Sequence, residues 1–209
     1  MLEYNNIVIF GYSGHSYVVI DTCLSNNLQI LGYFENSKID YNPYNLQFLG
    51  NEKEFDFNTL NKNTICFPAL GNNNVRKNLI DLFEKNILNQ VVLQHPNSIV
   101  SKSAKIGFST LISAGAVINP LAVIGKGCII NTSSIIEHEC KIGNFSHIAP
   151  GAVLAGNVEI GTCSFIGANS VIKQGVKIGD NVVIGAGSVI LKDIPNNNIF
   201  AGNPAKKIK

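Results

Sequence analysis

IGKGCIINTSSIIEHECKIGNFSHIAPGAVLAGNVEI, residues 124–160, repeats a six-residue pattern in which every sixth residue is a large aliphatic. A period of six is neither the 3.6 of a helix nor the 2 of a simple strand, so the chain must turn a corner after each short extended piece. Hexapeptide periods are typical of parallel β-helices. The ladder runs unbroken through Ile106, Ile112, Ile118, Ile124, Ile130, Ile136, Ile142, Ile148, Leu154, Ile160, Ile166, Ile172, Ile178, Ile184 and Ile190.

Two further regularities accompany this ladder. Four residues after each ladder position stands a small or β-branched residue, from Thr110 to Ser188, which fits a narrow interior corner. Glycine follows the ladder residue at every eighteenth position, so three hexads make one coil of a triangular prism. The glycines are Gly107, Gly125, Gly143, Gly161 and Gly179. Residues 106–195 are therefore predicted to form five coils stacked about 4.8 Å apart, with each buried isoleucine contributing roughly 1.5–3 kcal/mol.

The first 94 residues have a different pattern. Asn6–Phe10 reads as an apolar strand that runs into the glycine turn GYSGH at 11–15, and a helix follows. Such a turn lets backbone N–H groups approach a phosphate, although a tight turn without a ligand would look the same. A second strand, Gln29–Phe34, ends in Glu35 and Asn36, where an open α/β sheet presents groups to a ribose or base. This pattern predicts a Rossmann-like α/β domain.

The remainder of this domain is less regular. Residues 37–63 are rich in asparagine and carry no assignable element. Thr64–Pro68 reads as a strand, a helix is predicted from about Asn74 to Lys85, and Asn89–Leu93 reads as a last strand. We therefore predict two domains: a Rossmann-like domain at 1–94, and a β-helix at 95–209 that ends in a short C-terminal tail.

Composition narrows the range of functions. The formal net charge of the 209 residues is +2, which gives no reason to expect nucleic acid or an anionic membrane as a partner. Met1–Asn6 reads as a polar lead-in rather than a signal peptide, and no apolar run approaches the ~20 residues of a membrane span. Five cysteines without a CxxC pair indicate reduced thiols in the cytoplasm. Cys128 and Cys140 fall in the small-residue column and are expected to be packed.

One hexad departs from the neutral pattern of the prism, Ile136-Glu137-His138-Glu139-Cys140-Lys141. A carboxylate that holds one ring nitrogen of a histidine makes the other a better base near neutral pH. His147 is either a ligand-binding residue or a solvated surface residue, and His95, in a His-Pro junction, is expected to be structural. This hexad is the predicted site of chemistry.

Residues 131–161, the GYSGH turn, LGNNNVRK at 70–77 and AGNPAKKI at 201–208 together resemble the bacterial PglD/NeuD-type sugar acyltransferases. Nearly the whole chain is covered, and 37–63 matches worst. The likeness is greatest to acetyltransferases that modify the 4-amine of a UDP-linked 4-amino-4,6-dideoxy sugar on the route to N,N'-diacetylbacillosamine. The resemblance implies a left-handed β-helix, a homotrimer, and acetyl-CoA bound in the groove between neighbouring prisms, with no metal.

The resemblance also implies residue roles. His138 would be the general base for direct transfer in a ternary complex, Glu139 would tune it, and Asn131, one hexad earlier on the same face, would orient the substrate. The acetyl-CoA residues would be His147, Gly156, Ala168 and Ala186. The nucleotide-sugar residues would be Ser13, Gly14 and His15 at the phosphates, and Glu35, Asn36 and Gly71 beside the nucleotide. Relatives often carry an aspartate pair where this chain has Glu35-Asn36, which leaves UDP, GDP and dTDP open.

Three alternatives stay open at this stage. A sugar O-acetyltransferase of the sialic-acid type would use the same histidine on a hydroxyl group. A zinc hydrolyase on the same prism would need three histidine ligands, and the prism offers only His138 and His147. A non-catalytic module that binds a nucleotide sugar would not need a Glu-His-Glu corner.

Overall fold

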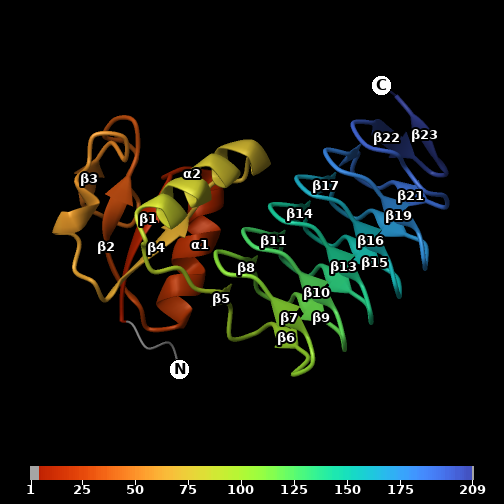
Figure 1. Ribbon diagram of the computed structural model, residues 1–209, viewed down its shortest axis with the longest axis horizontal. Coiled ribbons are helices and arrows are strands. Elements are labelled where there is room, and N and C mark those ends of the chain that lie inside the picture. The colour runs from red at the N-terminus through yellow and green to blue at the C-terminus, as the bar shows by residue number, and fades with distance from the viewer. Residues whose placement is uncertain (1–4, 209) are drawn as a thin grey trace.

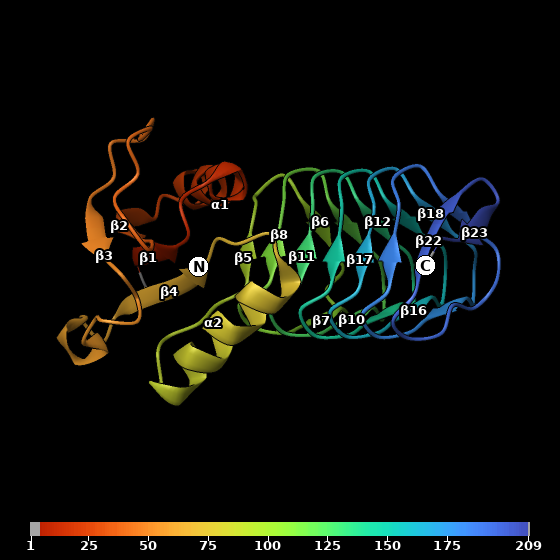
Figure 2. The same cartoon turned by 90° about the horizontal axis from the view of Figure 1, so that it is seen from above.

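The computed structural model describes residues 5–208 as an α/β unit followed by a long three-sided β-helix (Figure 1). Residues 1–4 of the predicted polar lead-in, and Lys209, lie outside the described residues. Figure 2 shows the coils stacked along one axis, with the α/β unit at the amino-terminal end of the stack. Among the helices that the structure describes, none is both long and apolar enough to cross a membrane.

The α/β unit is built on a four-stranded parallel sheet in the order β3-β2-β1-β4. Its strands are β1 (Asn6–Phe10), β2 (Gln29–Phe34), β3 (Phe48–Gly50) and β4 (Thr64–Pro68), and its helices are α1 (Gly14–Ser25), the 3-10 turn η1 (Phe57–Thr59) and α2 (Asn73–Lys85). Alternate residues of β1 point to opposite faces: Ile7 and Ile9 pack with α1, and Val8 and Phe10 with α2. The predicted β1, β2 and β4 are confirmed at their predicted bounds.

The β-helix has three parallel sheets, one for each side of the prism. The eight-stranded sheet contains β5 (Leu93–Gln94), β8 (Leu111–Ile112), β11 (Ile129–Ile130), β14 (His147–Ile148), β17 (Phe165–Ile166), β20 (Val183–Ile184), β22 (Ile199–Gly202) and the antiparallel β23 (Ala205–Lys207). The six-stranded sheet contains β6 (Ile99–Val100), β9 (Val117–Ile118), β12 (Ile135–Ile136), β15 (Val153–Leu154), β18 (Val171–Ile172) and β21 (Val189–Ile190). The five-stranded sheet contains β7 (Lys105–Ile106), β10 (Val123–Ile124), β13 (Lys141–Ile142), β16 (Glu159–Ile160) and β19 (Lys177–Ile178).

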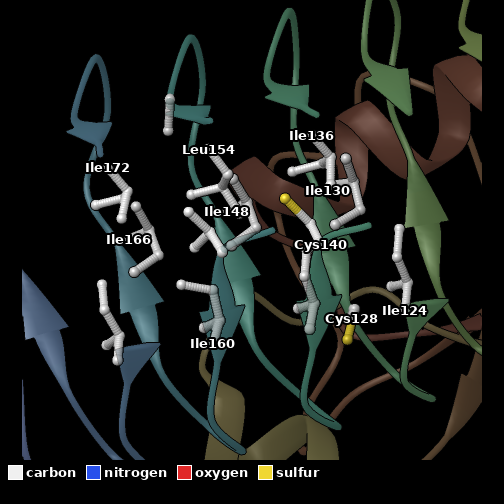
Figure 3. Close-up of a cluster of buried hydrophobic side chains, with 14 of the residues drawn as sticks. Ile124, Cys128, Ile130, Ile136, Cys140, Ile148, Leu154, Ile160, Ile166 and Ile172 are labelled. Carbon is white, nitrogen blue, oxygen red and sulfur yellow. The ribbon is translucent and has the colours of Figure 1, made fainter. Parts of the chain in front are cut away.

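The predicted ladder forms the core of the prism (Figure 3). From Ile112 to Ile190 its members are at most 3% exposed, and each pairs with the residue eighteen positions away, as Ile130 does with Ile148. The small-residue column is also buried. Its hydroxyls bond to carbonyls at the same corner, as when the Ser146 hydroxyl donates to the oxygen of Gly161 on the next coil at 2.6 Å. Small polar side chains therefore satisfy buried backbone groups as well as fitting the corner.

A third six-residue column consists of residues with left-handed backbone conformation, one at each corner of the prism. Its members are Ser109, Gly115, Leu121, Gly127, Ser133, Glu139, Phe145, Gly151, Asn157, Cys163, Asn169, Gly175, Asn181 and Gly187. Glycine and asparagine tolerate this conformation, whereas other side chains cost roughly 1–2 kcal/mol. Leucine, glutamate and phenylalanine are therefore unfavourable occupants of the column.

The α/β unit covers the first strands of the eight-stranded face. Leu93, Leu111 and Ile129 point outward from that face and are buried against the apolar cluster of the unit. The predicted strand Asn89–Leu93 is wrong. Asn89 makes one isolated bridge to Ile65 of the α/β sheet, whereas Leu93 already belongs to β5 and pairs with Leu111. The chain crosses from one sheet to another here, so no single strand can span the segment; the domain boundary after residue 94 stays a prediction.

Candidate active site

His138 lies on the turn between β12 and β13, at the corner where the six-stranded and five-stranded sheets meet. Its Nδ1 is 3.0 Å from Oε2 of Glu139, and the two side chains are 51% and 58% exposed. Because a carboxylate can only accept, Nδ1 carries the proton and the lone pair of Nε2 is available as a base. Glu137 is directed elsewhere, since its Oε2 accepts from the backbone N–H of His138 at 3.4 Å. The predicted pair is therefore His138 with Glu139.

Glu139 occupies the left-handed column with a φ of 62°. The equivalent residues one and two coils further on are Asn157 and Gly175, which suit this conformation. Strained backbone positions often cluster at functional sites because the site needs that particular side chain. Because Leu121 and Phe145 also occupy this column, the glutamate points to function only together with its hydrogen bond to His138.

Gly156 lies beside His138, on the next coil of the same corner. A Cβ atom added to Gly156 would stand 2.5 Å from both Cε1 and Nε2 of the His138 ring. Ala168 and Ala186 lie instead on turns that follow β17 and β20, at the corner between the eight-stranded and six-stranded sheets. The structure thus brings Gly156 to His138 and places Ala168 and Ala186 on a different corner.

A second polar group lies on the eight-stranded face. His147 is 8% exposed, which excludes the solvated surface role considered from the sequence. Its Nε2 is 3.1 Å from Nδ2 of Asn131. The side-chain Oδ1 of Asn131 accepts from the backbone N–H of Thr132 at 2.8 Å, which orients the side-chain amide. The Asn131 amide therefore donates to Nε2, and the His147 proton is on Nδ1. Asn131 was expected on the face of His138 and instead contacts His147.

His15 faces His147 from α1, with ring centroids 6.2 Å apart. Within residues 5–208, Nε2 of His15 and Nδ1 of His147 are buried without a hydrogen-bond partner. Gly71 lies against His15, because a Cβ on Gly71 would be 3.8 Å from the Cβ of His15. Buried unsatisfied polar atoms are rare in native proteins, so these two nitrogens are exceptions within the contact between α1 and the prism.

Arg76 of α2 provides the electrostatic environment of these histidines. It is 1% exposed and donates to the carbonyls of Gly127 at 2.7 Å and Phe145 at 2.8 Å, as well as to three oxygens of its own segment. Burial, and next the charge of Arg76, lower the pKa of His15 to about 4 and of His147 to about 3. Both imidazoles are therefore neutral at physiological pH.

The two groups lie on opposite sides of the prism. His138 is at the corner between the six-stranded and five-stranded sheets, whereas His147 points outward from the eight-stranded sheet, which is the side facing away from that corner. They therefore cannot line one site within a single chain.

The nucleotide residues predicted from the sequence lie at the carboxyl ends of β1 and β2. A cavity of about 470 Å³ there is lined by residues that include Glu35, Asn36, Glu52, Lys53 and Asn78. Oε2 of Glu35 accepts from the N–H of Tyr12 at 3.2 Å. Ser13 and Gly14 are exposed at the start of α1. His15 and Gly71, in contrast, face the prism and do not line this cavity.

Several residues were missed from the sequence. Arg76 stands where an apolar residue would be expected on α2, in line with Leu79, Ile80 and Phe83 at the i+3, i+4 and i+7 positions. That interruption was a usable signal. Glu52 and Lys53 lie in the irregular region, where no pattern could have identified them. Within residues 5–208, no group of three or more His, Cys, Asp or Glu side chains could hold a metal ion.

Comparison with protein families gives two matches. The PglD N-terminal domain model matches residues 6–83, and the bacterial transferase hexapeptide (six repeats) model matches 121–156, 139–174 and 157–192. A search of curated protein sequences gives no significant match. The prism and the match to the hexapeptide model indicate a transferase of the hexapeptide-repeat class.

Solved structures identify the family more closely. The acetyltransferase domain of PglB from Neisseria gonorrhoeae, also solved with acetyl coenzyme A, is 31% identical with a TM-score of 0.92 over 98% of this chain and 100% of that chain. Perosamine N-acetyltransferase from Caulobacter crescentus, with CoA and GDP-perosamine, is 27% identical with a TM-score of 0.89 over 98% and 97%. WeeI from Acinetobacter baumannii, at 24% identity and a TM-score of 0.84 over 97% and 99%, shares the fold. The chain belongs to the PglD/NeuD-type family of left-handed β-helix, acetyl-CoA-dependent sugar acetyltransferases.

Proposed function

We propose that this enzyme transfers the acetyl group of acetyl-CoA to the 4-amine of a nucleotide-linked 4-amino-4,6-dideoxy sugar, with UDP as the first candidate nucleotide and a bacillosamine-type sugar as the product. The observation that carries the proposal is the half-exposed His138, whose Nδ1 is held by Glu139 and whose Nε2 makes no hydrogen bond within residues 5–208. The perosamine enzyme, solved with CoA and GDP-perosamine, and its histidine variants support an amino-sugar substrate and a role for a histidine.

The proposed reaction is direct transfer. The sugar amine attacks the thioester carbonyl carbon, and Nε2 of His138 removes a proton from the amine as the C–N bond forms. The C–S bond then breaks, and the protonated imidazole returns the proton to the sulfur, which gives CoA thiol and the amide. Glu139 stabilises the imidazolium through Nδ1. Holding both substrates together supplies much of the rate by proximity.

The nucleotide would occupy the cavity beside Glu35 and Asn36. The exposed start of α1 at Ser13 and Gly14 presents backbone N–H groups that favour a phosphate. Both oxygens of Glu35 already accept backbone N–H groups, from Tyr12 and Asn36. The amide of Asn78 and the charges of Glu52 and Lys53 would therefore help to distinguish the bases.

We also infer a homotrimer with the active site between subunits. The outward residues of the six-stranded face are all aliphatic, whereas the five-stranded face carries mostly charge. The first set is Ile99, Val117, Ile135, Val153, Val171 and Val189, and the second is Lys105, Val123, Lys141, Glu159 and Lys177. An aliphatic sheet face favours packing against a second copy. The His138 corner of one chain would then meet the eight-stranded face of its neighbour, which carries His147 and Asn131, and the adjoining corner, which carries Ala168 and Ala186. These residues would contribute to an acetyl-CoA groove that Gly156 completes.

A cytoplasmic location fits this reaction. All five cysteines in the described residues are free, and cytoplasmic proteins keep their thiols reduced. Light scattering or sedimentation of the purified chain tests the trimer, since a monomer that is fully active would contradict a site shared between subunits.

The decisive test is CoA thiol release from acetyl-CoA with a panel of UDP-, GDP- and dTDP-linked 4-amino sugars. His138→Ala should lower kcat by on the order of 10²–10⁴, the contribution of one general acid–base group. Gln174→Ala is the matched control, because Gln174 occupies the same corner position two coils further on. Normal turnover by His138→Ala would remove this residue from the mechanism. Release with hydroxyl acceptors alone would indicate O-acetylation, and no release at all would indicate a binding module.

A further inference from the structure

The ring of His138 rests directly against the backbone of Gly156. A Cβ atom at residue 156 would lie 2.5 Å from Cε1 and Nε2 of the ring and 3.2 Å from Nδ1. Carbon atoms in contact are normally about 3.5–4.0 Å apart. No side chain at 156 can therefore coexist with the imidazole in its present place.

The backbone of this corner does not itself require glycine. Gly156 does not have the left-handed φ that favours glycine in other turns. The equivalent positions on the coils before and after are occupied by Pro120, His138, Gln174 and Lys192, all of which carry a Cβ. Only the neighbouring imidazole therefore makes glycine necessary at 156.

We propose that Gly156 is a positioning residue whose missing side chain seats the catalytic imidazole. With glycine, the ring lies on the corner, Nδ1 bonds to Glu139, and the Nε2 edge runs along the backbone of residue 156. With alanine, the half-exposed ring must rotate away toward solvent, because the turn backbone cannot yield as easily. The bond to Glu139 is then broken and Nε2 no longer faces the acceptor nitrogen.

This inference rests on the proposed role of His138, and it differs from the expectation that Gly156 makes room for the pantetheine arm. If glycine serves the imidazole, alanine at 156 acts only when the imidazole is present. If glycine serves the cofactor, alanine at 156 weakens acetyl-CoA binding whether or not residue 138 is histidine. A double-mutant cycle separates the two.

The experiment compares wild type, Gly156→Ala, His138→Ala and the double variant. We expect Gly156→Ala to lower kcat nearly as far as His138→Ala, on the order of 10²–10⁴, and the double variant to be no slower than His138→Ala. The acetyl-CoA Kd, measured by calorimetry, should be the same for His138→Ala and the double variant. The double variant should also unfold at no lower denaturant concentration than His138→Ala, which shows that the turn accepts alanine.

Distinct outcomes overturn distinct statements. Wild-type kcat in Gly156→Ala, with His138→Ala inactive, overturns the positioning role and leaves the proposed function intact. A weaker acetyl-CoA Kd in the double variant assigns Gly156 to the cofactor instead. Wild-type kcat in His138→Ala overturns the proposed mechanism itself. Histidine ring shifts in NMR spectra provide a direct readout, because the His138 resonances should move toward solvent-exposed values in Gly156→Ala.

Discussion

Glu139→Asn should make the enzyme more stable and less active. Glu139 has a φ of 62°, a left-handed conformation that costs most side chains roughly 1–2 kcal/mol and that asparagine tolerates. The substitution also removes an exposed contact to His138 at 3.0 Å, which is worth about 0–1 kcal/mol. The net expectation is a gain of about 1 kcal/mol in the free energy of unfolding.

The same substitution should lower kcat, because the shorter amide side chain cannot hold Nδ1 of His138 as the carboxylate does. A general acid–base group contributes on the order of 10²–10⁴ to the rate, and a residue that only orients it supplies part of that factor. We therefore expect kcat to fall by a factor on the order of 10–10². Denaturant unfolding and steady-state thiol release measure the two effects on the same preparation.

Leu121→Asn is the matched control. Leu121 lies one coil before Glu139 in the same column, with a φ of 65° and an exposed side chain. It should show the gain in stability with no change in kcat. If Glu139→Asn keeps full activity, the carboxylate does not hold the His138 ring in its active position. If neither variant gains stability, the left-handed conformation is not costly, and a glutamate in this column is no sign of function.

Two further predictions concern the contact between the α/β unit and the prism. Because the folded pKa values of His15 and His147, about 4 and about 3, lie below the unfolded value of 6.5, the unfolded chain binds more protons between these limits. The free energy of unfolding should thus be highest above pH 6.5 and should fall on acidification by about 1.4 kcal/mol per pH unit for each histidine. Denaturation at several pH values measures this fall, and a free energy of unfolding that stays constant from pH 6.5 to 4.5 would contradict it. Arg76→Met should cost about 3 kcal/mol or more, since it leaves the buried carbonyls of Gly127 and Phe145 unpaired; a loss under about 1 kcal/mol in denaturant would show that the anchor is dispensable.

The sequence predicts the parts of this molecule that local pattern controls. The ladder of the prism follows from a period that no other structure satisfies, and β1, β2 and β4 follow from short apolar runs. His138 and Glu139 stood out because they interrupt a neutral pattern, and the structure shows the contact between them; their catalytic role stays a prediction. Such features need no knowledge of distant contacts.

What could not be predicted depends on long-range contact. His147 is buried because His15 and α1 cover that face, and the spacing of hexads does not show which face is covered. Asn131 was expected near His138 but contacts His147. The seven positions from Asn131 to His138 take the chain around a corner onto the next sheet. The role of Arg76 depends on carbonyls about fifty or more positions away in the sequence.

The anchoring of α2 to the turns of Gly127 and Phe145 places His138, the proposed base, between two fixed points along the chain. An insertion of eighteen residues after Phe145 would leave the position of His138 relative to α2 unchanged. An insertion of eighteen residues between Gly127 and His138 would move the imidazole by about 4.8 Å along the axis of the prism. The distance along the axis between the α/β unit and His138 can therefore be altered only in whole coils.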